Sequence, residues 1–291
     1  QVLSGIARLG VDVLHLDNAN PAVISTYPME SKAILESMAK HCTSGNVLAL
    51  GLESADPKVH EMNNLNATAE QTLEAIRLIN QVGRERGPNG LPKLLPGVNF
   101  VVGLDGESEG TLQMDLGFLR NLLEEGLLVR RINIRQVSGI RREFRGGVGH
   151  SRFLRFKNAV RTEIDHEMLR RLVPQGTVLR NVYTELVEGK VTFGRQIGTY
   201  PLLVGIEHIL EKEKFLDVKV TGWGYRSITG VEYPLHINDC PIGAIESLPG
   251  VGRKRAMRLF RARKFAGADE FVAAMDDPKL ARDLLEYITF D

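Results

Sequence analysis

The stretch GVNFVVGLDGESEGT, residues 97–111, leads from an apolar segment into a turn with two glycines and a glutamate. Glycine lets the backbone approach a ligand closely, and the start of a helix presents free N–H groups to an anion. The turn is not a nucleotide fingerprint, because it lacks the third glycine of a dinucleotide-binding turn and the lysine of a P-loop. It therefore predicts either a site for another polar ligand or a plain connection between a strand and a helix.

Polar residues follow three other apolar segments of the first half in the same way. The stretches are HLDNAN at 15–20, GLES at 51–54 and RQVS at 135–138. In a parallel sheet, chemistry lies at the carboxyl ends of the strands, which meet at one edge. We therefore expect one rim of the sheet to be equipped for chemistry; the alternative is that these are ordinary polar loops.

The elements that must position these ends alternate between strands and helices. Apolar runs predict strands at 11–19, 46–54, the start of 97–111, and 130–140. Helices are predicted at 31–42, 68–83 and 111–126, where apolar residues recur at helical spacing. Continuous apolar strands between helices predict an α/β fold with a parallel sheet covered by helices.

The second half of the chain changes character twice. Residues 151–173 read as a long basic helix, after which Pro174 and Gly176 break the pattern. Short alternating runs with frequent glycines from about 177 to 238 predict a small antiparallel barrel or half-barrel. The segment after Cys240 reads as helical. We therefore expect three domains, at 1–174, 175–238 and 239–291.

The composition is that of an ordinary globular chain. Of 291 residues, 43% are hydrophobic and 25% are charged, and the net charge of +1 identifies no partner. No apolar run approaches the roughly 20 residues of a membrane span and no signal peptide opens the chain, so we expect no membrane partner. Cys42 and Cys240 lie far apart in sequence and fit no zinc, iron–sulfur or disulfide pattern, so we expect a reducing, cytoplasmic location. The opening QVLSGIARLG reads as the second half of a helix, which predicts a chain truncated before Gln1.

A pair of short helices near the end of the chain resembles the helix-hairpin-helix motif. In PIGAIESLPGVGRKRAMRLFRAR, apolar residues mark one face of each helix and PGVG forms the hairpin. The hairpin of that motif presents N–H groups to a nucleic-acid phosphate without reading sequence. The residues placed for such contact are Gly250, Gly252, Arg253, Lys254 and Arg255. Acidic residues of the same segment balance its charge, so a module that only caps the β domain is the alternative.

A second basic stretch, RREFRGGVGHSRFLRF, interleaves phenylalanines with arginines that include Arg142 and Arg145. Arginine combined with aromatic side chains can follow a phosphate backbone and stack on bases. The alternative is a solvated face whose phenylalanines anchor in the core.

Four of these stretches, taken in order, resemble the later strands of the radical S-adenosylmethionine (radical SAM) barrel: LALGLES, DPKVHEMNNLNATAEQTLEAI, NFVVGLDGES and NIRQVS. HLDNANPAVI and TFGRQIGTYPLLVG extend the resemblance over essentially the whole chain, to archaeal radical SAM enzymes that end in a helix-hairpin-helix. The β segment also resembles the small barrel of methylthiotransferases that act on tRNA. The resemblance implies a partial (β/α) radical-SAM-type barrel, a small β domain and a C-terminal helix-hairpin-helix.

This resemblance implies roles for the strand ends. The cofactor-binding residues that it implies are Glu53, Ser54, Gly103, Gly106, Arg135 and Gln136. The first two would lie near the ribose or the amino-acid part of S-adenosylmethionine, the glycines would let the backbone approach the adenosyl group, and the last two would line the same rim. From the residues alone, Glu53 can equally cap the following turn and Arg135 can pair with a neighbouring acid.

The same family uses a [4Fe–4S] cluster to cleave S-adenosylmethionine reductively to a 5′-deoxyadenosyl radical, and RNA is the substrate that the basic segments favour. The CxxxCxxC loop, whose three thiolates hold that cluster, is missing from this sequence. We therefore expect the C-terminal part of an enzyme, catalytically silent by itself and without a firmly bound cofactor. The rival function is a non-catalytic protein that binds RNA or DNA.

Overall fold

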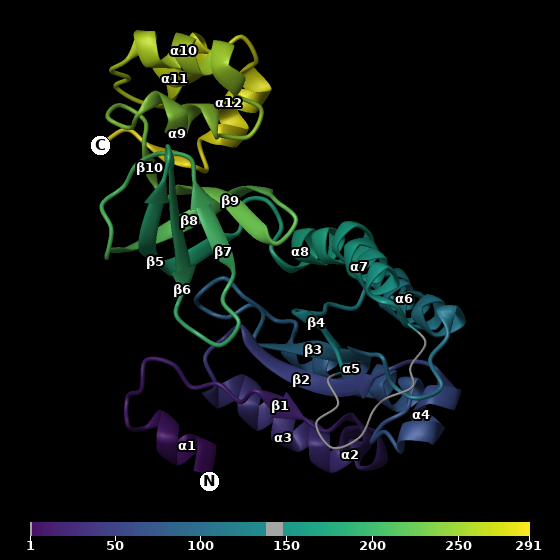
Figure 1. The fold of residues 1–291 in the computed structure, drawn as a ribbon. Coiled ribbons are helices and arrows are strands. Elements are labelled where there is room, and N and C mark those ends of the chain that lie inside the picture. Colours follow the sequence, from purple (N-terminus) through teal and green to yellow (C-terminus); the bar gives the residue numbers. More distant parts are fainter. Residues whose placement is uncertain (1, 138–147) are drawn as a thin grey trace. The chain divides into compact units, whose positions relative to one another are not determined.

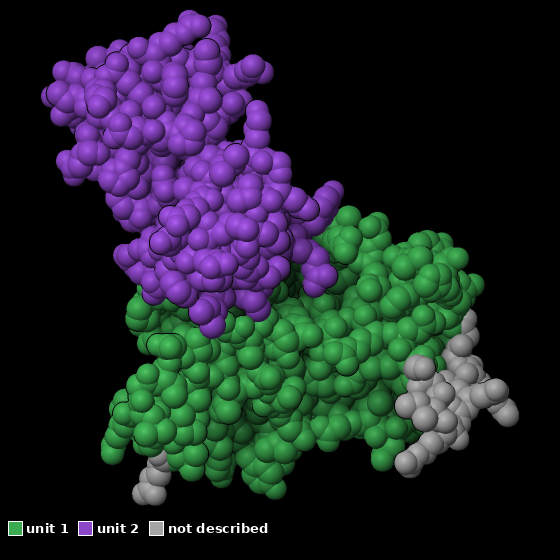
Figure 2. All heavy atoms as spheres, turned by 60° about the vertical axis from the view of Figure 1, so that its left-hand side comes forward, with its two compact units in different colours: residues 1–172, 198–200 green, residues 173–197, 201–291 purple. Residues whose placement is uncertain are grey.

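The computed structural model describes residues 2–137 and 148–291. It divides into two compact units, shown in different colours in Figure 2: residues 1–172 with 198–200, and residues 173–197 with 201–291. The second unit contains both the β segment and the terminal helices, for which the sequence suggested separate domains.

A sheet of four parallel strands forms the centre of the first unit (Figure 1). Its order is β1 (Asn18–Ala19), β2 (Asn46–Glu53), β3 (Leu94–Val102) and β4 (Ile132–Gln136). All three pairings are parallel, which confirms the expected α/β organisation.

The first strand is much shorter than the predicted 11–19. Leu14 N–H donates to Thr43 Oγ1 at 3.0 Å, and Leu16 N–H donates to Asn46 Oδ1 at 2.6 Å. Because side chains take these backbone groups, only Asn18–Ala19 is left to pair with β2. The predicted long strand was therefore wrong over most of its length.

Three helices lie where the apolar periodicity predicted them: α3 (Pro28–His41), α5 (Ala69–Gly83) and α6 (Glu109–Glu124). The structure also has α1 (Val2–Ala7), α2 (Pro21–Thr26) and α4 (Pro57–Asn63). Thr68 and Ser108 cap α5 and α6, and each receives a hydrogen bond from the helix while the third helical residue bonds back. The predicted long helix is α7 (His150–Ala159), a π-helical stretch (Val160–Asp165) and α8 (His166–Leu172) in succession.

One hydrophobic core joins these helices to a single face of the sheet. Leu48, Leu50 and Leu52 of β2 contribute to it, as do Val98, Phe100 and Val102 of β3. Side chains alternate between the two faces of a strand, so the residues between these point to the other face.

A closed five-stranded barrel opens the second unit (Figure 1). Its strands are β5 (Val178–Glu188), β6 (Val191–Gln196), β7 (Leu203–Ile206), β8 (Phe215–Trp223) and β9 (Ser227–Glu232). The order around the barrel is β5-β6-β7-β9-β8, and every pair is antiparallel except β7 with β9. This is the strand order of the OB-fold, a Greek-key barrel.

Four helices and a two-stranded sheet complete the second unit. They are β10 (Leu235–His236), α9 (Ile242–Glu246), α10 (Gly252–Ala262), α11 (Ala268–Ala274), α12 (Pro278–Leu284) and β11 (Ile288–Thr289). They share a core of their own, in which Phe265, Phe271 and Phe290 meet edge to face. In the part of the chain that is described, no helix has the length and apolar character to cross a bilayer.

Candidate functional site

The face of the sheet turned away from the helical core is polar at the carboxyl ends of its strands. The residues on this face there come from alternate positions of three strands: Gly51, Glu53, Asn99, Val101, Asn133 and Arg135. All of them are half-buried or exposed, whereas the intervening residues of β2 and β3 are buried. We call this group the open face. Ligands of parallel α/β sheets bind at this end of the strands.

Glu53 has an unusual backbone for a side-chain-bearing residue. Its φ is +63°, in the left-handed region that favours glycine. The register of β2 against β3 shifts between Gly51 and Glu53, as in a β-bulge. A Cβ atom at Gly51 would lie 2.9 Å from Glu53 Oε1, so the carboxylate folds back over the open face into space that only glycine leaves free.

The Glu53 carboxylate is half-buried, and burial and a nearby positive charge have opposite effects on its pKa. Burial raises the pKa of this carboxyl, and the positive charge of Arg135 partly offsets the increase. Asn133 Nδ2 donates to Asn99 Oδ1 at 3.2 Å on the same face. The open face thus offers an acid, a guanidinium and two amides, which together can bind hydroxyl, ammonium and carboxylate groups of one ligand.

Ser54 points the other way, into the protein. Its side chain is buried, and Ser54 Oγ donates to Asp115 Oδ1 of α6 at 3.2 Å. Ala55 N–H donates to the same oxygen at 2.6 Å. Ser54 therefore stabilises the turn after β2 and does not belong to the open face.

The turn at 103–107 is filled by its own glutamate. Gly103 N–H donates to Glu107 Oε2 at 2.7 Å, and Leu104 N–H donates to Glu107 Oε1 at 3.2 Å. These are the N–H groups that a bound anion would use. Gly103 and Gly106 have φ of +102° and +84°, and a Cβ at either would meet Val137 or Met62. Both glycines are thus required by packing in the protein itself.

Three buried carboxyl groups lie behind the strand ends, on Asp56, Glu107 and Asp115. Burial raises the pKa of Asp115 to about 7, and the nearby charges of Glu107 and Asp56 act in the same direction. Burial also raises the pKa of Glu107. In the described residues no group of three His, Cys, Asp or Glu side chains could hold a metal ion. The three acids accept hydrogen bonds from backbone N–H groups of the segments after the strands.

Of the residues expected at the rim, the structure brings Glu53 and Arg135 together on one face. Gln136 follows Arg135 and pairs with Val102, so its side chain points to the opposite face of the sheet from Arg135, where it is exposed. Sequence reasoning missed Gly51, Asn99 and Asn133. Strand alternation could have identified them, because each lies two positions before another open-face residue on its strand and therefore on the same face.

The hairpin between α9 and α10 brings its glycines to the amino end of α10. Gly250 and Gly252 have φ of +72° and +42°, and no acidic side chain lies in the first turn of α10. Arg253 and Lys254 are exposed. Arg255 differs, because it donates to Gly250 O at 2.7 Å and to Asp276 Oδ1 at 2.8 Å, which ties the hairpin to the segment before α12.

The second basic stretch is described only in part. Arg142 and Arg145 lie outside the described residues. Phe153 and Phe156 of α7 are buried in the helical core, where Phe156 meets Phe100 edge to face. These two phenylalanines anchor the helix and are not available to stack on bases.

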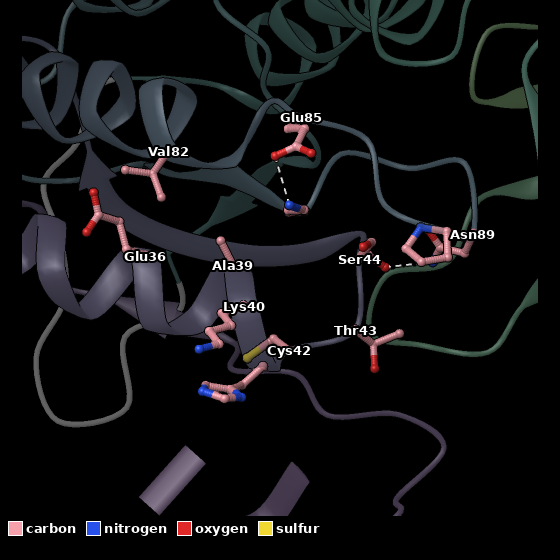
Figure 3. A pocket seen from close by; sticks show the side chains of 12 residues that line it. Glu36, Ala39, Lys40, Cys42, Thr43, Ser44, Val82, Glu85 and Asn89 are labelled. Atoms are coloured by element: carbon pink, nitrogen blue, oxygen red, sulfur yellow. Dashed lines mark hydrogen bonds and ion pairs between the residues drawn. The ribbon is translucent and has the colours of Figure 1, made fainter. Parts of the chain in front are cut away.

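A hollow of about 680 Å³ lies at the opposite, amino end of the sheet (Figure 3). Residues that directly precede β2 and β3 line it, together with the ends of α3 and α5. Lys93 Nζ and Glu85 Oε2 form an ion pair across 2.8 Å, and Asn89 Nδ2 donates to Ser44 O at 2.8 Å. Several polar groups of this hollow are therefore already paired with one another.

The two cysteines do not resemble cluster ligands. Cys42 and Cys240 are both buried and belong to different units. Burial raises the pKa of the Cys42 thiol, and that of Cys240 to about 11, which disfavours the thiolate that binds iron. This chain therefore contains no set of residues that fits a [4Fe–4S] cluster.

Comparison with known proteins finds two similar archaeal proteins, both described as uncharacterized. One, from Methanocaldococcus jannaschii, is 47% identical over 227 residues, which is 75% of this chain and 42% of that protein. The other, from Archaeoglobus fulgidus, is 42% identical over 256 residues, 85% of this chain and 48% of that protein. The chain spans less than half the length of these curated relatives. No family model matches it.

Proposed function

We propose that the chain is the C-terminal part of a radical SAM enzyme, and that the open face of its parallel sheet binds S-adenosylmethionine. The observation that carries this proposal is the Glu53 carboxylate, folded back over Gly51 at the carboxyl end of β2 and within electrostatic reach of Arg135. Strained backbone and a half-buried charge recur at functional sites, where they hold a group ready for a ligand.

S-adenosylmethionine carries groups that match the open face. Glu53 would accept hydrogen bonds from the ammonium or the ribose hydroxyls, and Arg135 would pair with the carboxylate. Asn99 and Asn133 would donate to and accept from the remaining polar atoms. When bound, S-adenosylmethionine supplies the 5′-deoxyadenosyl group with which this family abstracts hydrogen from a substrate. The residues of this chain bind and orient that molecule.

The iron–sulfur cluster must be held elsewhere, since neither cysteine of this chain fits it. The relatives are more than twice as long as the part that matches this chain. We place the CxxxCxxC ligands in that remainder, and we derive no step of the reaction through the cluster from the residues described above.

The decisive experiment uses the complete coding sequence that contains this chain, expressed and purified without oxygen. The expected result is absorbance of a [4Fe–4S] cluster and formation of 5′-deoxyadenosine from S-adenosylmethionine under reducing conditions. A complete protein that has no CxxxCxxC loop and forms no 5′-deoxyadenosine would contradict the proposal.

A second candidate function is binding of RNA or DNA without catalysis. It is favoured by the amino end of α10, where exposed Arg253 and Lys254 flank a glycine hairpin of the helix-hairpin-helix type. The OB-like strand order of the barrel adds an analogy at the level of the fold. In a complete enzyme, the same surface would hold an RNA substrate.

Salt dependence tests this surface. A single-stranded RNA oligonucleotide should bind more weakly as salt increases, and the double variant Arg253→Ala/Lys254→Ala should lower the slope of log K against log salt by roughly 1 to 2. Lys212→Ala, an exposed lysine outside the hairpin, is the matched control. Affinity that does not change with salt would exclude phosphate contacts as the basis, and comparison with DNA of the same sequence shows which nucleic acid is preferred.

A further inference from the structure

The turn after β2 is held from behind the open face. Asp115 Oδ1 accepts hydrogen bonds from Ser54 Oγ at 3.2 Å and from Ala55 N–H at 2.6 Å. Asp56 N–H in turn donates to Ser54 Oγ at 3.2 Å. The side chain of Asp115 therefore fixes the two residues that directly follow Glu53 in the chain.

The helix that carries Asp115 also holds the next part of the turn. Thr111 Oγ1, one turn earlier on α6, donates to Asp56 Oδ2 at 2.6 Å. Asp56 Oδ1 accepts from Lys58 N–H at 2.9 Å and so caps α4. The polypeptide from Ser54 to α4 is thus tied to α6 by two buried side chains one helical turn apart.

We propose that Asp115 is a positioning residue for Glu53: its hydrogen bonds to Ser54 and Ala55 hold the left-handed turn that folds the Glu53 carboxylate over Gly51. A glutamate does not adopt φ of +63° without support, because its Cβ crowds the backbone there. Such a conformation persists where the surrounding contacts determine it. The contacts of the two residues that follow Glu53 in the chain converge on Asp115. The inference concerns the position of Glu53 and holds for any ligand of the open face.

The titration of Glu53 itself reports its position. While the carboxylate is folded over the sheet, burial holds its pKa above the ordinary value. If the turn relaxes, the side chain enters solvent and the pKa falls. Carbon-13 NMR of the glutamate carboxyl groups measures this in the chain without ligand, and Glu53→Gln identifies the resonance.

We expect Asp115→Ala to lower the pKa of Glu53 by roughly half a unit or more. Asp115→Asn should restore most of the original value, because the amide keeps an acceptor oxygen at the same place. Asp12→Ala, at an exposed aspartate, should leave the titration of Glu53 unchanged. A folded Asp115→Ala protein with the original Glu53 titration would overturn the proposal.

Ser54→Ala carries the same test if Asp115→Ala does not fold. It removes the hydrogen bonds of Ser54 Oγ with Asp115 and with Asp56 N–H, and it leaves Asp115 its backbone donor at Ala55. It should shift the pKa of Glu53 in the same direction by a smaller amount, and no shift would overturn the proposal. The assignment of the ligand is tested separately, by S-adenosylmethionine affinity of the complete protein. If these variants shift the pKa of Glu53 but leave the affinity for S-adenosylmethionine unchanged, the proposed function is contradicted and the positioning role of Asp115 stands.

Discussion

The two ends of the parallel sheet show different ways of placing polar groups on one scaffold. At the amino end, a hollow of about 680 Å³ contains charged side chains that reach water, and its ion pair joins Lys93 to Glu85, whose side chain is 74% exposed. At the carboxyl end, Glu53 has left-handed backbone and three carboxyl groups are buried behind it. The two ends therefore differ in kind: the amino end offers a hollow with solvated charges, and the carboxyl end offers a left-handed backbone with buried charge behind it.

The largest expected difference between the two ends is the effect of pH on stability. The folded-state pKa of Asp115 is raised from 3.8 to about 7. Its contribution to stability is therefore fully present below about pH 4 and is lost as pH rises through 7, by about 4 kcal/mol at 1.36 kcal/mol per pKa unit. Asp115→Asn should flatten the decrease of the free energy of unfolding between pH 4 and pH 8, as measured by urea denaturation.

Glu85→Gln is the control at the amino end, because that carboxyl group is largely in water. It should leave the pH dependence as in the unchanged protein. An equally steep decrease in Asp115→Asn would mean that another group is responsible, and Glu107, whose pKa burial also raises, would be the next to test.

The second expected effect is on ligand binding in the complete protein. Under the proposed function, Glu53→Gln removes a charge that would accept hydrogen bonds from the ligand, so we expect a loss of about 1.5 to 3 kcal/mol, or roughly 10- to 150-fold in affinity. Isothermal titration with S-adenosylmethionine measures it. If Glu85→Gln lowered the affinity for S-adenosylmethionine as much as Glu53→Gln does, the carboxyl end could not be assigned as the binding site in preference to the amino end.

A smaller effect is expected from Gly51→Ala. The new Cβ would lie 2.9 Å from Glu53 Oε1, the end of a flexible side chain that can move away. Stability should change by less than about 1 kcal/mol, while affinity for S-adenosylmethionine should fall several-fold because the carboxylate is displaced. Gly117→Ala, an exposed glycine on α6 with open space around its Cα, should preserve affinity and raise the melting temperature slightly.

The smallest effect is expected at the amino end itself. Lys93→Ala removes the ion pair with Glu85, and exposed pairs contribute less than about 1 kcal/mol. Thermal denaturation should show a shift of only a few degrees, with unchanged ligand affinity. A marked loss of affinity in this variant would instead make the hollow in Figure 3 the functional site.

Much of the fold of the first unit could be predicted from apolar periodicity. The strands at 46–54 and in 97–111 and the helix at 68–83 appear within a few residues of their predicted places, because each has a continuous apolar core and recognisable caps. The strand at 11–19 failed because side chains of Thr43 and Asn46 compete for its backbone groups. Such competition between residues roughly 30 apart leaves no local signal.

The candidate site was predicted less completely than the fold. Glu53 and Arg135 were identified, but Ser54 and Gln136 were grouped with them although adjacent residues of a strand point to opposite faces. Asp115 was missed, yet its spacing from Leu112 and Leu119 places an acid on the apolar face of α6. An acid in such a position indicates a buried partner, which only the fold could identify as the turn after β2.

The Glu107 side chain gives the loop between β3 and α6 a further property. Because this carboxylate already accepts hydrogen bonds from the N–H groups of Gly103 and Leu104, the loop needs no bound ligand to satisfy them. Glu107 thus takes the place that a bound anion would occupy at these two N–H groups, and the corner between β3 and α6 is closed by the protein's own side chain.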